Sequence, residues 1–207
     1  MRLTRSVSYF LAPVLAPAAL ALGLNAMPAA QPAQAAETFA IDLAHSNIVF
    51  LIDHLGYSRM IGQFQDFEGS FTFDEADVTK STLSVTVQTA SVDTDHEARD
   101  NHLRSPDFFN AAEFPEMTFK STVIEKTSES TGKITGDLTL LGTTKPVTLD
   151  VRFHKKAPHP LPQYNGVLVA GFSARASLLR SEWGMKTFVP NLGDEIEIWI
   201  EIEGHQK

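Results

Sequence analysis

The 207-residue chain contains no cysteine, and its 17 Lys and Arg residues are outnumbered by 25 Asp and Glu residues. Without cysteine the fold cannot depend on disulfides, and a thiolate metal site or a lipid-bearing N-terminal Cys is excluded. The formal net charge of -8 argues against nucleic acid or an anionic membrane surface as the main partner, because both attract basic patches. The composition favours a soluble protein held together by a hydrophobic core.

The N-terminal segment has the layout of an export signal. A basic start is followed by an apolar run from Val7 to Leu24 and by the small residues of Ala33-Gln34-Ala35. We therefore expect a signal peptide over residues 1–35, cleaved after Ala35, and a periplasmic mature domain of residues 36–207. The alternative is a retained membrane anchor, although two prolines interrupt the apolar run.

The mature segment is dominated by strand patterns. Glu195–Glu203 alternates without a break, with isoleucines on one face and glutamates with one tryptophan on the other. This two-residue period is typical of a half-buried antiparallel strand. The other expected strand segments are 48–52, 60–74, 83–87, 117–126, 134–140, 147–153 and 167–179. We expect one all-β domain, a single antiparallel barrel of about eight strands, which is the size that holds one small ligand.

One expected strand contains an irregularity. Along the segment from Met60 to Asp74 the phenylalanines change parity after Phe64. Only an extra residue returns all of their rings to one face of the sheet. The pattern therefore predicts a β-bulge or a bend near Gln65 and Asp66.

The segment from Thr94 to Asn110 carries helix signals instead of a strand period. Thr94 and Glu97 have the spacing of a capping box, and Ser105-Pro106 is a stop signal. We expect a short helical insert near residues 94–110, followed by a turn through Phe108 and Phe109. These two rings either plug one end of the barrel as core residues or line an entrance.

Ordered motifs along the whole mature segment resemble the YceI family of exported polyisoprenoid-binding proteins. The N-terminal motifs are Ile41-Asp42-x-x-His45-Ser46, His54-Leu55-Gly56-x-Ser58, Gly62-x-Phe64-x-x-Phe67-x-Gly69 and Ser91-Val92-Asp93-Thr94. The later motifs are Arg99-Asp100-x-His102-Leu103-Arg104-Ser105-x-Asp107-Phe108-Phe109, Phe114-Pro115-x-Met117-Thr118-Phe119-Lys120-Ser121, Gly136-Asp137-Leu138-Thr139-Leu140-x-Gly142-x-Thr144-Lys145-Pro146-Val147, Gly171-Phe172-Ser173-Ala174 and Arg180-Ser181-Glu182-Trp183-Gly184. Leu43 and Arg59-Met60 differ from the residues that are common in the family at these positions, and we interpret these differences as ordinary variation. The resemblance implies a lipocalin-like barrel whose apolar interior holds a polyisoprenoid lipid of the quinone or polyprenyl type.

Alternate residues of a small barrel point inward, so the apolar parity of each strand supplies the expected wall of a ligand pocket. The wall candidates are Ile48, Phe50, Ile52, Phe64, Leu83, Val85, Val87, Phe119, Leu138, Val151, Phe172, Ile198 and Ile200. At each of these positions an ordinary packed core residue is the alternative.

A lipid head group also needs partners at the barrel mouth. Guanidinium groups suit phosphate, and aromatic faces suit a quinone ring. The mouth candidates are Arg99, His102, Arg104, Phe108, Phe109, Arg180 and Trp183. For Arg99 and Arg104 the alternative is a surface ion pair with a nearby aspartate.

The motifs of catalysis and of metal binding are missing. The segment Gly171–Arg175 lacks the second glycine of a nucleophile elbow, and His45, His54, His96 and His102 lack zinc-protease spacing. We expect a binding or carrier protein and no enzyme, with no catalytic cofactor and no bound metal. The alternatives are an envelope interaction or stress-response module without turnover, and an enzyme that acts on an isoprenoid. Transient membrane contact, a homodimer and the identity of the lipid stay open.

Overall fold

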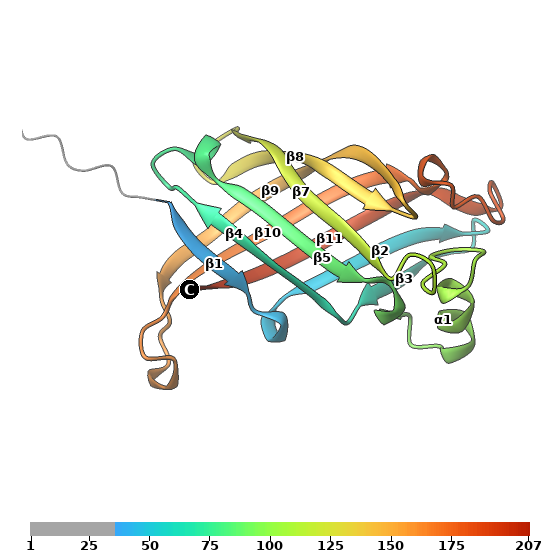
Figure 1. The fold of residues 1–207 in the computed structure, drawn as a ribbon, viewed down its shortest axis with the longest axis horizontal. Coiled ribbons are helices and arrows are strands. Elements are labelled where there is room, and N and C mark those ends of the chain that lie inside the picture. The colour runs from blue at the N-terminus through green and yellow to red at the C-terminus, as the bar shows by residue number, and fades with distance from the viewer. Residues whose placement is uncertain (1–35) are drawn as a thin grey trace, which may run out of the picture. The chain divides into compact units, whose positions relative to one another are not determined.

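The computed structural model describes residues 36–207, which form one antiparallel sheet that closes into a barrel (Figure 1). Its strands are β1 (Glu37–Ile41), β2 (Asn47–His54), β3 (Ser58–Phe64), β4 (Phe67–Phe73), β5 (Thr82–Gln88), β6 (Val92–Asp93), β7 (Glu116–Lys126), β8 (Thr131–Leu140), β9 (Thr143–Pro158), β10 (Leu168–Leu179) and β11 (Leu192–Gln206). Its helices are α1 (Glu97–Arg104) and the short 3-10 helices η1 (Leu43–His45), η2 (Val78–Lys80), η3 (Thr89–Ser91), η4 (Pro162–Tyr164) and η5 (Arg180–Trp183).

The signal peptide expected over residues 1–35, with its cleavage after Ala35, lies outside the described residues. Within residues 36–207, no helix has the length and apolar character needed to cross a membrane.

The 11 strand segments make up an eight-stranded barrel, because three of its strands are bent into two parts. β1 and β2 pair with successive parts of β11, while β3 and β4 pair with β2 and β1 in turn. β5 and β6 follow the same pattern against β4 and β3. From there β7 to β11 run as a simple meander, and β11 returns to β1. The predicted closed antiparallel barrel is confirmed.

Strand parity decides which side chains face the barrel interior. Along β11, Ile198 and Ile200 pack against the main hydrophobic cluster, while Glu195 and Glu201 on the other face are exposed. The alternation read from the sequence therefore separates an apolar inner surface from a charged outer surface.

The bend predicted near Gln65 and Asp66 is confirmed. β3 ends at Phe64 and β4 begins at Phe67, so the ladder is interrupted at those two residues. Phe64, Phe67 and the later Phe71 are all buried. The two intervening residues correct the parity and place all three rings on the inner side of the sheet.

The helical insert is shorter than expected, and the predicted capping box is wrong. The N-cap of α1 is His96, whose Nδ1 accepts the backbone N–H of Arg99 at 3.2 Å. Thr94 instead donates its N–H and its hydroxyl to the buried carboxylate of Asp100. Because the Thr94 hydroxyl donates its hydrogen bond to Asp100, it does not cap α1. Asp95 takes a left-handed conformation (φ 58°) before the helix begins. The predicted stop at Ser105 is confirmed, since α1 ends at Arg104.

The seam of the barrel is closed by the short strand β1. Phe39 is fully buried, and its ring stacks on Phe71 with centroids 5.0 Å apart. Gly204 of β11 lies against the Phe71 ring and the Cβ of Phe39, and a Cβ built there would lie 2.5 Å from Phe71 Cζ and 3.2 Å from Phe39 Cβ. The seam therefore needs a residue without a side chain at this position.

Replacing Gly204→Ala should lower the free energy of unfolding by about 1–3 kcal/mol, because the new methyl group overpacks the seam. Urea denaturation measures this change. Gly171→Ala in the neighbouring strand β10 is the matched control, since the nearest atom to its Cβ would be Ile202 O at 4.0 Å. Equal stability of the two variants would show that the Phe71 ring moves aside without cost.

Candidate ligand-binding tunnel

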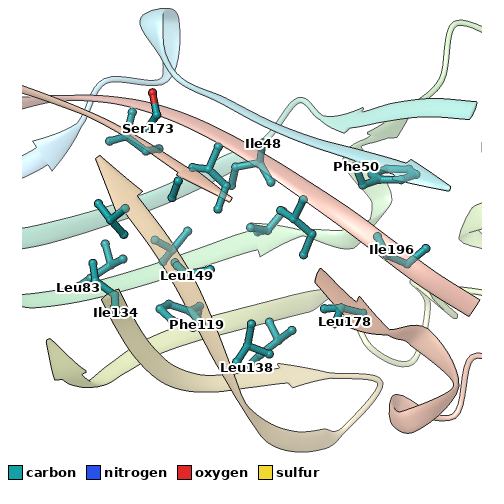
Figure 2. A pocket seen from close by; sticks show the side chains of 18 of the residues that line it. Ile48, Phe50, Leu83, Phe119, Ile134, Leu138, Leu149, Ser173, Leu178 and Ile196 are labelled. Carbon is teal, nitrogen blue, oxygen red and sulfur yellow. The ribbon is translucent and has the colours of Figure 1, made fainter. Parts of the chain in front are cut away.

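A cavity of about 960 Å³, referred to below as the tunnel, extends through the inside of the barrel. Pockets for small organic ligands have volumes of about 300–1,000 Å³. Figure 2 shows side chains from different strands, among them Ile48, Phe119 and Leu138, pointing toward one shared space. The tunnel is large enough to hold a ligand of substantial size.

All of the wall positions predicted from strand parity line the tunnel. They are Ile48, Phe50, Ile52, Phe64, Leu83, Val85, Val87, Phe119, Leu138, Val151, Phe172, Ile198 and Ile200. Many of these side chains, including Phe50, Phe119 and Ile198, are only partly buried although they face the interior. Phe64 and Val87 are buried among their neighbours. Partly buried apolar residues inside a closed sheet mean that the interior is hollow.

Other apolar wall residues were missed by the sequence analysis. Ile134, Leu149, Leu178 and Ile196 also line the tunnel (Figure 2). Ile196 shares the face of Ile198, so the parity rule identifies it once it is applied along the whole strand. Leu178 carried a weaker signal, because the two inward residues just before it in β10, Ala174 and Ala176, are small.

Two glycines in the wall allow aromatic rings to lie flat against the sheet. A Cβ at Gly62 would lie 2.7 Å from Phe50 Cε1, and one at Gly136 would lie 2.5 Å from Phe119 Cζ. Each ring therefore occupies the space that a side chain on the facing strand would fill. In this position the rings cover the backbone of the wall without filling the centre of the tunnel.

One end of the barrel carries α1, the β2–β3 turn and the β10–β11 connection (Figure 1). We call it the α1 end. Leu55 and Phe188 line the tunnel there, yet they are 50% and 59% exposed to solvent. A residue that both lines a cavity and contacts solvent marks an opening. The α1 end is therefore an entrance with an apolar rim.

Cationic and aromatic residues of α1 and the following turn border this entrance. Arg99 lines the tunnel and donates from Nε to Thr94 Oγ1 and from Nη2 to Thr94 O, at 2.7 Å each. His102 Nε2 lies 3.0 Å from Asp107 Oδ2, and its ring packs edge-on against Phe108 with centroids 5.0 Å apart. The mouth candidates Arg99, His102, Phe108 and Phe109 thus all border the tunnel.

Arg180 also lines the tunnel, but its side chain is only 1% exposed and binds backbone. Its Nε donates to Gly193 O at 2.8 Å, Nη1 to Met185 O at 3.1 Å, and Nη2 to Thr187 O at 2.9 Å and Leu192 O at 3.2 Å. Burial lowers the pKa of Arg180, although a guanidinium group remains protonated at neutral pH. Arg180 therefore holds the β10–β11 connection in its folded path beside the entrance.

A neighbouring carboxylate anchors the same connection. Asp194 accepts the Ser181 N–H at 2.8 Å and the Ser181 hydroxyl at 2.7 Å. Burial alone would raise the pKa of Asp194, but these hydrogen bonds and the charge of Arg180 lower it below the ordinary value. The carboxylate is therefore ionised at neutral pH.

Arg104 and Trp183, the remaining mouth candidates, lie outside the residues that line the tunnel. Arg104 donates to Ala90 O at 2.7 Å and Val92 O at 2.8 Å, which ties α1 to the strand part β6. Trp183 is buried, and its Nε1 donates to Leu138 O at 3.2 Å. Both side chains position the elements around the entrance.

The opposite end of the tunnel is narrowed by aromatic rings. Phe73, Phe153 and Phe172 contact one another with ring centroids 5.3 Å apart in each pair. Lys156 lies over the Phe73 ring and bridges Glu37 and Glu75, with Nζ–O distances of 2.7 and 3.0 Å. The charged lining residues beyond this cluster lie in and beside the β7–β8 turn and include Glu125, Lys126, Glu129 and Lys133. The central stretch of the tunnel is thus apolar, with charged side chains at the two ends.

Ser173 lies in a polar cluster on the outer face of the barrel, and its hydroxyl points away from the other wall side chains (Figure 2). The hydroxyl donates to Glu201, and His154 Nε2 lies 2.6 Å from Ser173 Oγ. A serine nucleophile must donate its proton to the histidine, and the histidine to the acid. Here the serine proton is directed to the carboxylate, so this cluster does not activate a nucleophile.

A family profile of the YceI-like domain matches residues 39–204. Protein YceI of Escherichia coli O17:K52:H18 (strain UMN026 / ExPEC) is 42% identical over 163 residues, which cover 79% of this chain and 83% of the relative.

Solved structures share the barrel. The YCEI protein of Campylobacter jejuni is 36% identical, with a TM-score of 0.68 over 75% of this chain and 90% of that chain. A polyisoprenoid binding domain from Saccharophagus degradans is 11% identical, with a TM-score of 0.56 over 84% of this chain and 100% of that chain. At 11% identity the likeness shows the fold alone.

The position of Arg180 predicts a structural role beside the entrance. Arg180→Lys should lower the free energy of unfolding by about 2–4 kcal/mol, because an ammonium group cannot reach the same set of carbonyl oxygens. Arg175→Lys on the outer face, where the side chain is 44% exposed, should change stability by less than about 1 kcal/mol. Urea denaturation of both variants measures the difference, and a fully stable Arg180→Lys variant would contradict the assigned role.

Proposed function

The chain belongs to the YceI family, and from this premise and the tunnel we propose that it is a binding protein that holds the hydrocarbon chain of a polyisoprenoid lipid. Its distant structural neighbour from Saccharophagus degradans is itself a polyisoprenoid binding domain. Because the two proteins share a fold, we infer that this chain also binds a polyisoprenoid inside its barrel. The protein would bind this lipid without converting it.

The observation that carries the proposal is the hollow apolar wall. Phe50, Phe119 and Ile198 face the interior of a closed sheet and remain only partly buried. Apolar surface left in contact with water costs about 25 cal/mol per Å², and a hydrocarbon ligand removes that cost when it enters. An elongated, unbranched or methyl-branched chain fits a space that extends along the barrel between its ends.

The energetics favour exchange over permanent storage. Burial of hydrocarbon from water contributes about 0.8 kcal/mol per methylene, so a chain of about twenty carbons has about 16 kcal/mol available. A lipid that starts in a bilayer already has most of this stabilisation, because the bilayer is as apolar as the tunnel. The net preference for the protein is therefore small, which suits a carrier or reservoir that takes up and releases its lipid.

The polarity of the α1 end supports entry with the head group outermost. Arg99 and His102 border the entrance, and their side chains donate hydrogen bonds to phosphate or carbonyl oxygens. Phe108 and Phe188 offer aromatic faces beside them. We propose a prenyl lipid with a quinone or phosphate head group at this end and its tail toward the aromatic cluster around Phe172.

The sequence pattern of an export signal over residues 1–35 supports a periplasmic location. A hydrophobic lipid cannot cross that aqueous compartment at a useful concentration without a carrier that covers its chain. We therefore propose that the protein carries or stores prenyl lipid between the membranes that border the periplasm.

Freshly purified protein should contain a bound lipid. Native mass spectrometry is expected to show a hydrophobic molecule on the chain that organic extraction removes. The extracted protein should then take up a polyprenol, a polyprenyl phosphate or a quinone, and the ranking of the three identifies the head group. Absence of any co-purified hydrophobic molecule, together with failure to take up all three probes, would overturn the proposal.

A side chain that fills the tunnel should block uptake. Ala174 of β10 is buried and lines the tunnel, whereas Ser177 of the same strand is exposed on the outer face. Overpacking by Ala174→Trp costs the bound state about 1–3 kcal/mol, which weakens lipid affinity about 5- to 150-fold. Ser177→Trp adds the same ring outside the barrel and should leave affinity unchanged in a fluorescent polyprenol titration. Equal affinities in the two variants would place the ligand outside the tunnel.

A further inference from the structure

A cluster of metal-ligating side chains lies on the outer surface of the barrel, away from the tunnel. It forms where β1 turns into β2 through η1 and meets the C-terminal end of β11 (Figure 1). Asp42 comes from the turn, and Glu203 and His205 come from β11. One donor atom from each of the three residues lies within 4.8 Å of the other two. Closure of the barrel brings these residues together from opposite ends of the described chain.

The imidazole of His205 points its Nε2 atom at both carboxylates without reaching either. Nε2 lies 3.5 Å from Glu203 Oε1 and 3.7 Å from Asp42 Oδ2. Both distances exceed those of an N–H···O hydrogen bond. The atom is buried and makes no hydrogen bond within the described part of the chain. A buried polar atom that makes no hydrogen bond is uncommon, and here two carboxylates lie within ion-pair distance of it.

Two of the three separations between these donor atoms are close to the edge of a metal coordination shell, and the third, between the two carboxylates, is within 4.8 Å. Metal–ligand distances of about 2.0–2.2 Å, as for Zn²⁺, put the donor atoms of a tetrahedron about 3.3–3.6 Å apart. The observed separations of 3.5 and 3.7 Å are close to that range. One imidazole and two carboxylates are ligands that Zn²⁺ accepts.

Surrounding residues hold the donor atoms in place. Asp42 Oδ2 lies 2.6 Å from His45 Nδ1, while Asp42 Oδ1 accepts the backbone N–H of Ala44 at 3.2 Å. Ser46 is buried, and its hydroxyl accepts the backbone N–H of Glu203 at 3.0 Å. The Asp42 N–H donates to Glu203 O at 2.8 Å. A ligand fixed by a neighbouring histidine and by backbone is typical of a metal site.

The side chains around the site are partly exposed. Those of Asp42, Glu203 and His205 are 21%, 31% and 25% exposed, although the Nε2 atom of His205 is itself buried. On one side the ring of Tyr164, from the β9–β10 connection, packs edge-on against His205 with centroids 5.8 Å apart. That contact orients the imidazole, while water can take the remaining coordination position.

We propose that Asp42, Glu203 and His205 bind a divalent transition-metal ion, Zn²⁺, with His45 as the residue that positions Asp42. The ion links the β1–β2 turn to the last strand and so braces the seam of the barrel. This site does not depend on the lipid proposal, because it lies on the other face of the sheet.

The test is a titration of Zn²⁺ into the full chain without a histidine tag, after treatment with a chelator and removal of that chelator. Calorimetry should show one ion per chain, and Co²⁺ in its place should give the absorption bands of low-coordinate cobalt. His205→Ala should abolish this binding, and His45→Ala should weaken it by about 10- to 100-fold. His154→Ala is the matched control, because His154 lies beside Glu201 on the same outer surface and should leave binding unchanged.

Thermal unfolding supplies a second readout. Zn²⁺ should raise the unfolding midpoint of the wild-type chain and of His154→Ala by mass action, and leave that of His205→Ala unchanged. Absence of saturable binding to the wild-type chain would overturn the proposal. Equal Zn²⁺ affinity of the wild-type and His205→Ala chains would overturn it as well, by placing the ion elsewhere. Uptake of lipid probes by the same samples tests the tunnel separately.

Discussion

The closed ring of backbone hydrogen bonds is the constraint on which the rest of the structure depends. Once β11 pairs with β1 as well as with β10, the strand number and the strand tilt determine the width of the barrel. The sheet then cannot collapse to remove a void in its centre. Side chains from the wall reach only part of the way across, and glycines beneath Phe50 and Phe119 let two of the largest rings lie along it. The tunnel is thus a consequence of closure, and the apolar parity of the strands determines what it can hold.

The two ends of the barrel differ in a way that gives the tunnel a direction. At one end Phe73, Phe153 and Phe172 converge, and Lys156 bridges two carboxylates beside them. At the other end α1 and the β10–β11 connection surround an opening with an apolar rim. The stretch between the two ends is apolar, so a molecule with a long apolar chain matches the tunnel better than a compact polar molecule does.

Local sequence rules predicted the bend at Gln65 and Asp66, the wall positions and the strands other than β1 and β6, because each depends on periods of a few residues. The capping box failed because buried Asp100 competes for the Thr94 hydroxyl. The tie made by Arg180 could not be predicted, since its acceptors are backbone carbonyls that carry no sequence signal. The approach of His205 to Asp42 likewise needs barrel closure, which no local pattern encodes.

Two sets of hydrogen bonds hold β11, the strand that completes the barrel. At its N-terminal end Arg180 binds the carbonyls of Leu192 and Gly193, and at its C-terminal end Ser46 and Asp42 hold the backbone of Glu203. A hollow barrel lacks the central packing that fixes strands in an ordinary core, so its seam is the place where ligand exchange could open the sheet. Polar ties at both ends of the seam strand supply stability that does not depend on whether the tunnel is filled. Under the proposed function, lipid would enter and leave through the α1 end while the sheet stays closed.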